Sequence, residues 1–246
     1  MRKLLFPLIV IACLLGSALA AHAQLTFPSG GSSSGGSGTV AGQYIVNDWY
    51  LAENSYLTGG TAQSNITTTS IACSPLKFVY ATVTIKALAA YVATISAAGN
   101  FQLALYTSAS DRPATLLSAV SANMSTGTAQ AVSQALNSNV QVGPGSTGGV
   151  IVWACAMVDN TTVKFYVDAD GLNGVAYNGS STLSNVLATN NISMQGVKCT
   201  TTGCQGGTIT FGTWPASLAT STWTDVNANG SGNMVPIVAI QAASTP

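Results

Sequence analysis

From about residue 40 onward, apolar side chains recur at every second position, which is the spacing of a β-strand with one buried face. Glycine, serine, asparagine and proline interrupt the pattern at intervals of about ten residues, and no helical stripe of apolar residues stands out. The alternating or short apolar segments are 78–86, 88–96, 101–106, 116–120, 163–167, 192–196, 208–211 and 235–241. This pattern predicts an all-β fold, specifically an antiparallel, jelly-roll-like β-sandwich.

The segment 150–158 differs from the others because both of its alternating faces are apolar. Such a run predicts a central strand that is covered on each side, with Trp153 in the core. Asp159 and Asn160 follow directly, and the alternation resumes at Val163. We therefore expect a hairpin between 150–158 and 163–167.

The first 23 residues have the pattern of a secretory signal peptide. Arg2 and Lys3 precede an apolar run over residues 4–20, and a small-x-small site ends at Ala23. Two alternatives remain open. The run of about 17 residues is near the lower limit for an uncleaved anchor, and Cys13 lies in a sequence like that of a lipidation site, although the apolar run continues beyond it. No later stretch is long and apolar enough to cross a membrane.

The predicted domain organisation follows from this cleavage site. Residues 1–23 are the signal peptide, residues 24–42 a flexible tether that contains PSGGSSSGGSG, and residues 43–246 a single β-sandwich domain. The expected location is outside the cytoplasm: secreted, periplasmic or on the cell surface.

Charged residues make up only 6% of the chain, whereas 47% of the residues are hydrophobic, which argues against disorder. Without Arg2 and Lys3, the seven bases become five against seven acids, a net charge of about −2. The chain has no basic patch with which to neutralise phosphates, so no nucleic-acid partner is expected. The single histidine, His22, leaves with the signal peptide and takes with it the commonest general base and metal ligand.

Four cysteines remain after signal removal, and an even number in an exported chain predicts two disulfides. Three pairings exist, and the simplest joins Cys199 to Cys204 across a turn-like stretch and Cys73 to Cys155. A zinc site is the competing interpretation, but the spacing lacks a paired C-x-x-C and no histidine is present to assist. We expect no metal and no other cofactor.

Candidate catalytic residues are few. Asp168 and Asp170 are close enough in sequence to be considered as the carboxylate pair of a glycosidase. The following Gly171 favours a turn instead, and the same residues match only a fragment of a calcium loop. A Ser-His-Asp catalytic triad is not expected, because no histidine remains after signal removal. We therefore expect no catalytic residue and no enzymatic activity, with a secreted carbohydrate-active enzyme as the weaker alternative.

Four aromatic residues are the candidate ligand-binding side chains. Trp214 and Trp223 lie in one stretch rich in serine, threonine, asparagine and glycine, and Trp49 and Tyr50 lie in another. Aromatic rings stack on the C–H faces of sugars while amides and hydroxyls bind the sugar hydroxyls, so these loops suit glycan binding. For Trp214, which precedes Pro215, packing over the sandwich is the competing interpretation.

Two stretches carry a family resemblance. Residues 101–120 read FQLALYTSASDRPATLLSAV, and the strand 150–158 with Trp153 follows a Pro144-Gly145 turn, before a final apolar segment at 235–240. This order resembles the distal β-sandwich domain of bacteriophage tail-fibre and related virion proteins, over roughly residues 43–241. The resemblance implies surface recognition or a virion-structural role without catalysis. The signal peptide is a departure, because tail proteins assemble in the cytoplasm.

The leading hypothesis is thus an exported, non-enzymatic β-sandwich for surface recognition or attachment, with a cell-surface glycan or protein as its partner. The alternative is a structural virion subunit, tail-fibre-like and virion-associated, whose apolar faces pack into a homo-oligomer.

Overall fold

The computed structural model describes residues 46–51, 61–62, 66–79, 81–96, 98–167, 194–227 and 237–244. All of them belong to one compact unit, residues 40–246. Their regular elements are β-strands only, in antiparallel sheets, which confirms the all-β prediction. No helix among these residues is long and apolar enough to cross a membrane. The predicted signal peptide and tether lie outside the described residues.

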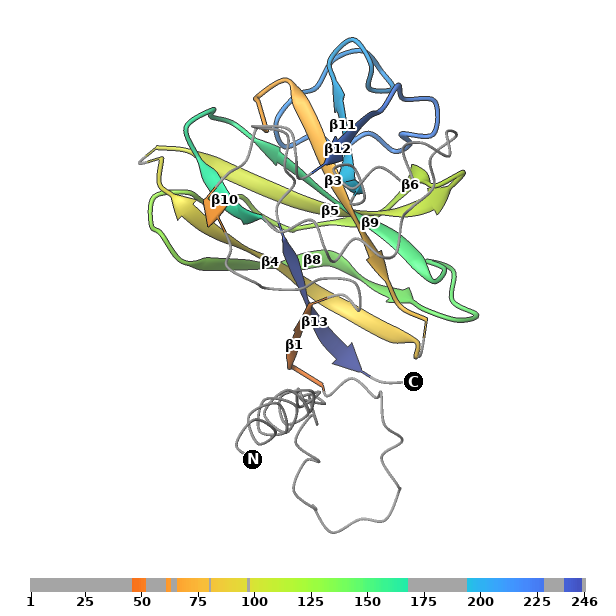
Figure 1. Ribbon diagram of the computed structural model, residues 1–246. Helices are drawn as coiled ribbons and strands as arrows, with labels where there is room; N and C mark the ends of the chain where they lie inside the picture. Colours follow the sequence, from red (N-terminus) through yellow and green to blue (C-terminus); the bar gives the residue numbers. More distant parts are fainter. Residues whose placement is uncertain are drawn as a thin grey trace, which may run out of the picture. The chain divides into compact units, whose positions relative to one another are not determined.

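The strands form two sheets (Figure 1). The first sheet has the order β1-β13-β4-β10-β2, and β8 also pairs with β4. Its strands are β1 (Trp49–Leu51), β2 (Thr61–Ala62), β4 (Val83–Thr94), β8 (Ala131–Val142), β10 (Lys164–Val167) and β13 (Val238–Ser244). The second sheet has the order β12-β11-β3-β9-β5-β6, and β7 also pairs with β5. Its strands are β3 (Ser70–Lys77), β5 (Asn100–Ala109), β6 (Arg112–Ala119), β7 (Met124–Ser125), β9 (Ile151–Val158), β11 (Met194–Thr200) and β12 (Thr224–Asn227).

The chain changes sheet at most of its connections, and this overturns the predicted hairpin. β9 pairs with β3 and β5, whereas β10 pairs with β4 and β2 in the other sheet. Asp159 and Asn160, which were expected to form the hairpin turn, instead lie where the chain crosses from the second sheet to the first. The carboxylate of Asp159 accepts hydrogen bonds from the backbone N and the Nδ2 of Asn100, at 2.6 and 2.9 Å, so it joins the end of β9 to the start of β5. Asn160 Oδ1 accepts from the backbone N of Val163 and turns the chain toward the other sheet.

The main core lies between the two sheets. Buried residues of both sheets point into it, such as Val83, Ile85 and Leu88 from β4. The rings of Phe101 and Phe165, one from each sheet, meet edge to face with centroids 4.9 Å apart. This is the layered burial that period-two patterning predicts.

β9 is the central, doubly covered strand that its sequence predicts. Val152, Ala154, Ala156 and Val158 face the core between the sheets, while Trp153, Cys155 and Met157 belong to a second buried cluster on the outer side of the second sheet. Trp153 has no exposed surface, so its assignment to the core is confirmed.

Residues 201–223, here called the cap segment, cover this outer side of the second sheet. Ile209, Phe211, Trp214, Leu218 and Trp223 pack against the second cluster. Part of the segment also pairs with β6: the backbone N of Leu116 donates to Ala216 O at 3.0 Å, and that of Leu218 donates to Ala114 O at 2.6 Å. The cap segment therefore protects one edge of the sheet as well as one face.

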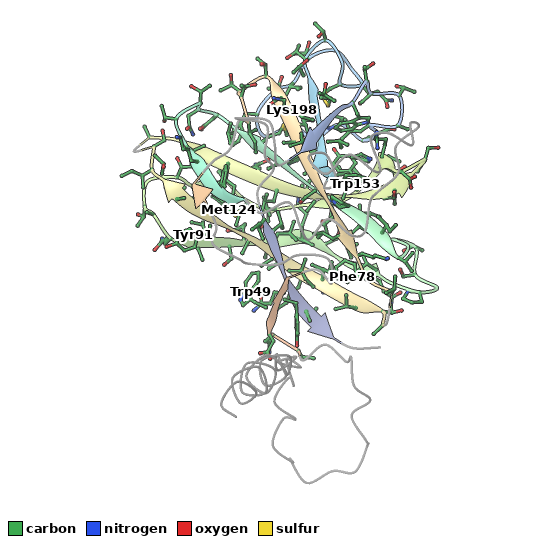
Figure 2. All side chains as sticks on the ribbon, in the orientation of Figure 1. Trp49, Phe78, Tyr91, Met124, Trp153 and Lys198 are labelled. Carbon is green, nitrogen blue, oxygen red and sulfur yellow. A yellow bond between two sulfur atoms is a disulfide. The ribbon has the colours of Figure 1, made fainter. Side chains whose placement is uncertain are left out.

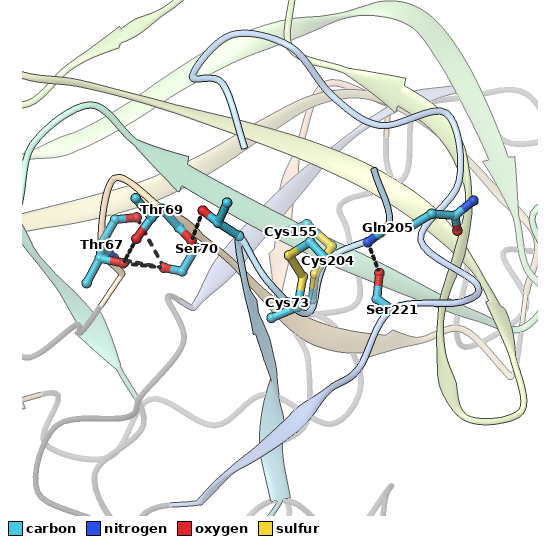
Figure 3. The surroundings of a disulfide bond; sticks show 10 residues. Thr67, Thr69, Ser70, Cys73, Cys155, Cys204, Gln205 and Ser221 are labelled. Atoms are coloured by element: carbon cyan, nitrogen blue, oxygen red, sulfur yellow. Dashed lines mark hydrogen bonds between the residues drawn. A yellow bond between two sulfur atoms is a disulfide. The ribbon is translucent and has the colours of Figure 1, made fainter. Parts of the chain in front are cut away.

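Two disulfides brace this arrangement, Cys73–Cys155 and Cys199–Cys204, which is the simplest of the three predicted pairings. Cys73 and Cys155 are directly opposite each other on β3 and β9. Cys199–Cys204 joins the end of β11 to the start of the cap segment. Figure 3 shows the surroundings of the disulfides, with Cys73, Cys155 and Cys204 labelled. Just beyond Cys204, the backbone N of Gln205 donates to Ser221 Oγ at 2.8 Å and holds the two ends of the segment together.

Candidate binding surface

The four predicted aromatic candidates separate into two places. Trp214 and Trp223 are half-buried and pack on the second cluster, over the outer side of the second sheet. Trp214 Nε1 donates to Gln102 Oε1 at 3.0 Å, and its ring lies 6.2 Å from that of Tyr106. Trp223 Nε1 is buried without a hydrogen-bond partner among the described residues. Trp49 and Tyr50 lie in β1, on the first sheet, so the structure does not bring the two pairs together.

Trp49 and Tyr50 point to opposite sides of the first sheet because successive side chains of a strand alternate. Tyr50 is opposite Ile240 in the register with β13 and packs with it against the core between the sheets. Trp49 is opposite Gln241 and faces outward, with 42% of its surface exposed. Only one residue of this pair is thus available to a ligand on the outer face.

Tyr91 is a second exposed ring on the same face, and the sequence reasoning did not select it. It lies on β4 with 41% of its surface exposed, whereas its neighbours Ala90 and Val92 face the core. The alternation that would have identified Tyr91 was present in the sequence. Once Leu88, Ala90 and Val92 are assigned to the inner face, Tyr91 is the only aromatic residue left on the outer face of that strand. Figure 2 shows Trp49 at β1 and Tyr91 at β4.

Small side chains form the floor between these two rings. Ala239 of β13 is opposite Ala89 of β4, which is in turn opposite Ser133 of β8. The adjacent row is Gln241, Ala87 and Ala135. Ala87 and Ala89 are only 6% and 9% exposed although neither belongs to a core cluster, so other atoms of the protein cover this part of the outer face. The outer face of the first sheet therefore carries two partly exposed aromatic rings, with small side chains between them in the register.

The register gives the spacing of the rings. Trp49 lies two strands from β4, level with Ala87, and Tyr91 is four residues farther along β4. With strands about 4.8 Å apart and a rise of about 3.3 Å per residue, the two Cα positions are roughly 16 Å apart.

Polar groups at the Trp49 end are organised around Asn47. Lys86 Nζ donates to Asn47 Oδ1, and Gln241 Nε2 donates to Asn47 O at 2.8 Å. The ladders of β4 with β13 and with β8 shift register between Ile85 and Ala87, which places Lys86 at an irregularity of the strand. The Lys86 ammonium thus has a protein partner, and the alanine floor itself carries no charge.

The described residues contain no group of three or more His, Cys, Asp or Glu side chains that could hold a metal ion. Asp168 and Asp170 lie outside them. Desolvation raises the pKa of the Asp159 carboxyl, but hydrogen bonds from Asn100 and Asn160 outweigh it and hold that pKa below its ordinary value. Asp159 therefore acts as a structural acceptor at the crossover between the sheets.

No protein-family model matches this chain, and no curated protein matches its sequence. The function is therefore inferred from the chemistry of the exposed face.

Proposed function

We propose that this protein is an exported, non-enzymatic β-sandwich that recognises or attaches to a surface, and that it binds carbohydrate through the outer face of the first sheet. The observation that carries this proposal is the exposure of Trp49 and Tyr91 on one face, on either side of an alanine floor. Exposed aromatic rings offer an apolar face to the C–H groups of a sugar, and this contact needs no charge.

Other features of the molecule support this role. The floor and both rings are on hydrogen-bonded strands, which hold binding groups more rigidly than loops do. Gln241 and Ser133 supply an amide and a hydroxyl beside the floor. The two disulfides are compatible with an oxidising, extracellular compartment. In this proposal the sandwich is jelly-roll-like, and its likeness to tail-fibre domains reflects a shared task of surface recognition.

The test is a glycan array followed by binding measurements on Trp49→Ala, Tyr91→Ala and the double variant. We expect each single substitution to weaken binding about tenfold, which corresponds to about 1.4 kcal/mol. Trp214→Phe is the matched control, because Trp214 is also a half-exposed aromatic residue but lies over the other sheet. Unchanged binding by the double variant, or loss of binding by Trp214→Phe, would move the site away from the first sheet.

The same experiment addresses the alternatives. A wild-type protein that binds no glycan and forms a stable homo-oligomer by light scattering would favour the structural virion subunit. Glycan hydrolysis that Asp168→Asn abolishes would favour the carbohydrate-active enzyme.

A further inference from the structure

We draw no further inference here: the strongest candidate, the outward side of the cap segment with the exposed side chains of Thr208, Thr210 and Thr213, carries no proposal because nothing in the structure shows what would cover it.

Discussion

The outer faces of the two sheets both carry aromatic residues, but these residues are buried on one sheet and partly exposed on the other. On the second sheet, Tyr106 and Trp153 point outward but have no exposed surface, because the cap segment lies over them. On the first sheet, Trp49 and Tyr91 also point outward and remain about two-fifths exposed. Large aromatic side chains on an outer face thus indicate either a second buried layer or an open surface, and only the covering segment distinguishes the two.

The polar atoms of the two buried rings, Tyr106 and Trp153, have hydrogen-bond partners. Tyr106 Oη donates to Pro215 O at 2.7 Å, and Trp153 Nε1 donates to Ser108 Oγ at 3.1 Å. Such a partner lowers the cost of burying a donor, and Trp223 Nε1, which is buried without one among the described residues, is the exception. Burial also raises the pKa of the Tyr106 phenol above its ordinary value, so the hydroxyl stays protonated and remains a donor. On the outer side of the second sheet, Tyr106 therefore binds the cap segment and Trp153 binds β5, whereas Trp49 and Tyr91 on the first sheet remain partly exposed.

The largest expected effect is the loss of the disulfide beneath the cap segment. Replacing both Cys73 and Cys155 by alanine should lower the free energy of unfolding by roughly 4–5 kcal/mol, because this bridge closes a long loop of the unfolded chain, with a separation of 82 residues. The matched change at Cys199 and Cys204, separated by 5 residues, should cost roughly 2 kcal/mol. Urea denaturation of both variants measures the difference. Equal losses would show that the bridges act mainly on the folded state.

The second effect compares one tryptophan from each face. Trp214→Ala should cost about 3 kcal/mol, since it removes a packed ring and leaves the buried Gln102 Oε1 without its donor. Trp49→Ala should cost about 1 kcal/mol or less, because 42% of its surface is already exposed and it lies on an edge strand. Thermal and urea unfolding provide the measurement. A larger loss at Trp49 would mean that the first sheet has no open outer face.

The smallest effect belongs to Asp159, which lies at the crossover and on neither face. Its folded-state pKa is below the ordinary value of 3.8, so the stabilisation it contributes is complete above about pH 4 and is lost as the pH falls through the folded-state pKa. Asp159→Asn should therefore be less stable than the wild type at pH 6, and the difference should shrink below pH 4. The free energy of unfolding between pH 6 and pH 2 tests this. A difference that stays constant over that range would show that the carboxylate charge contributes nothing.

Much of this fold was predictable from local pattern, and the errors have specific causes. The apolar run around Trp153 identified a strand covered on both faces, because a strand exposed on one side would alternate. The hairpin prediction after Val158 was wrong because Asp159 bonds to Asn100, a residue far away in the sequence. At the candidate site, Trp49 was selected from the composition of the stretch around it. Tyr91 was missed because its exposure depends on which face of β4 points into the core.

By itself, the sequence determined the class of fold, the central strand and the most economical cysteine pairing. These follow from the two-residue period of the side chains and from short-range chain geometry, both of which act over a few neighbouring positions. Only the tertiary structure decided which sheet each strand joins, which outer face the cap segment covers and which aromatic rings stay in contact with solvent. These depend on contacts between residues far apart in the chain, because burial is a property of the whole packed arrangement and not of any single segment.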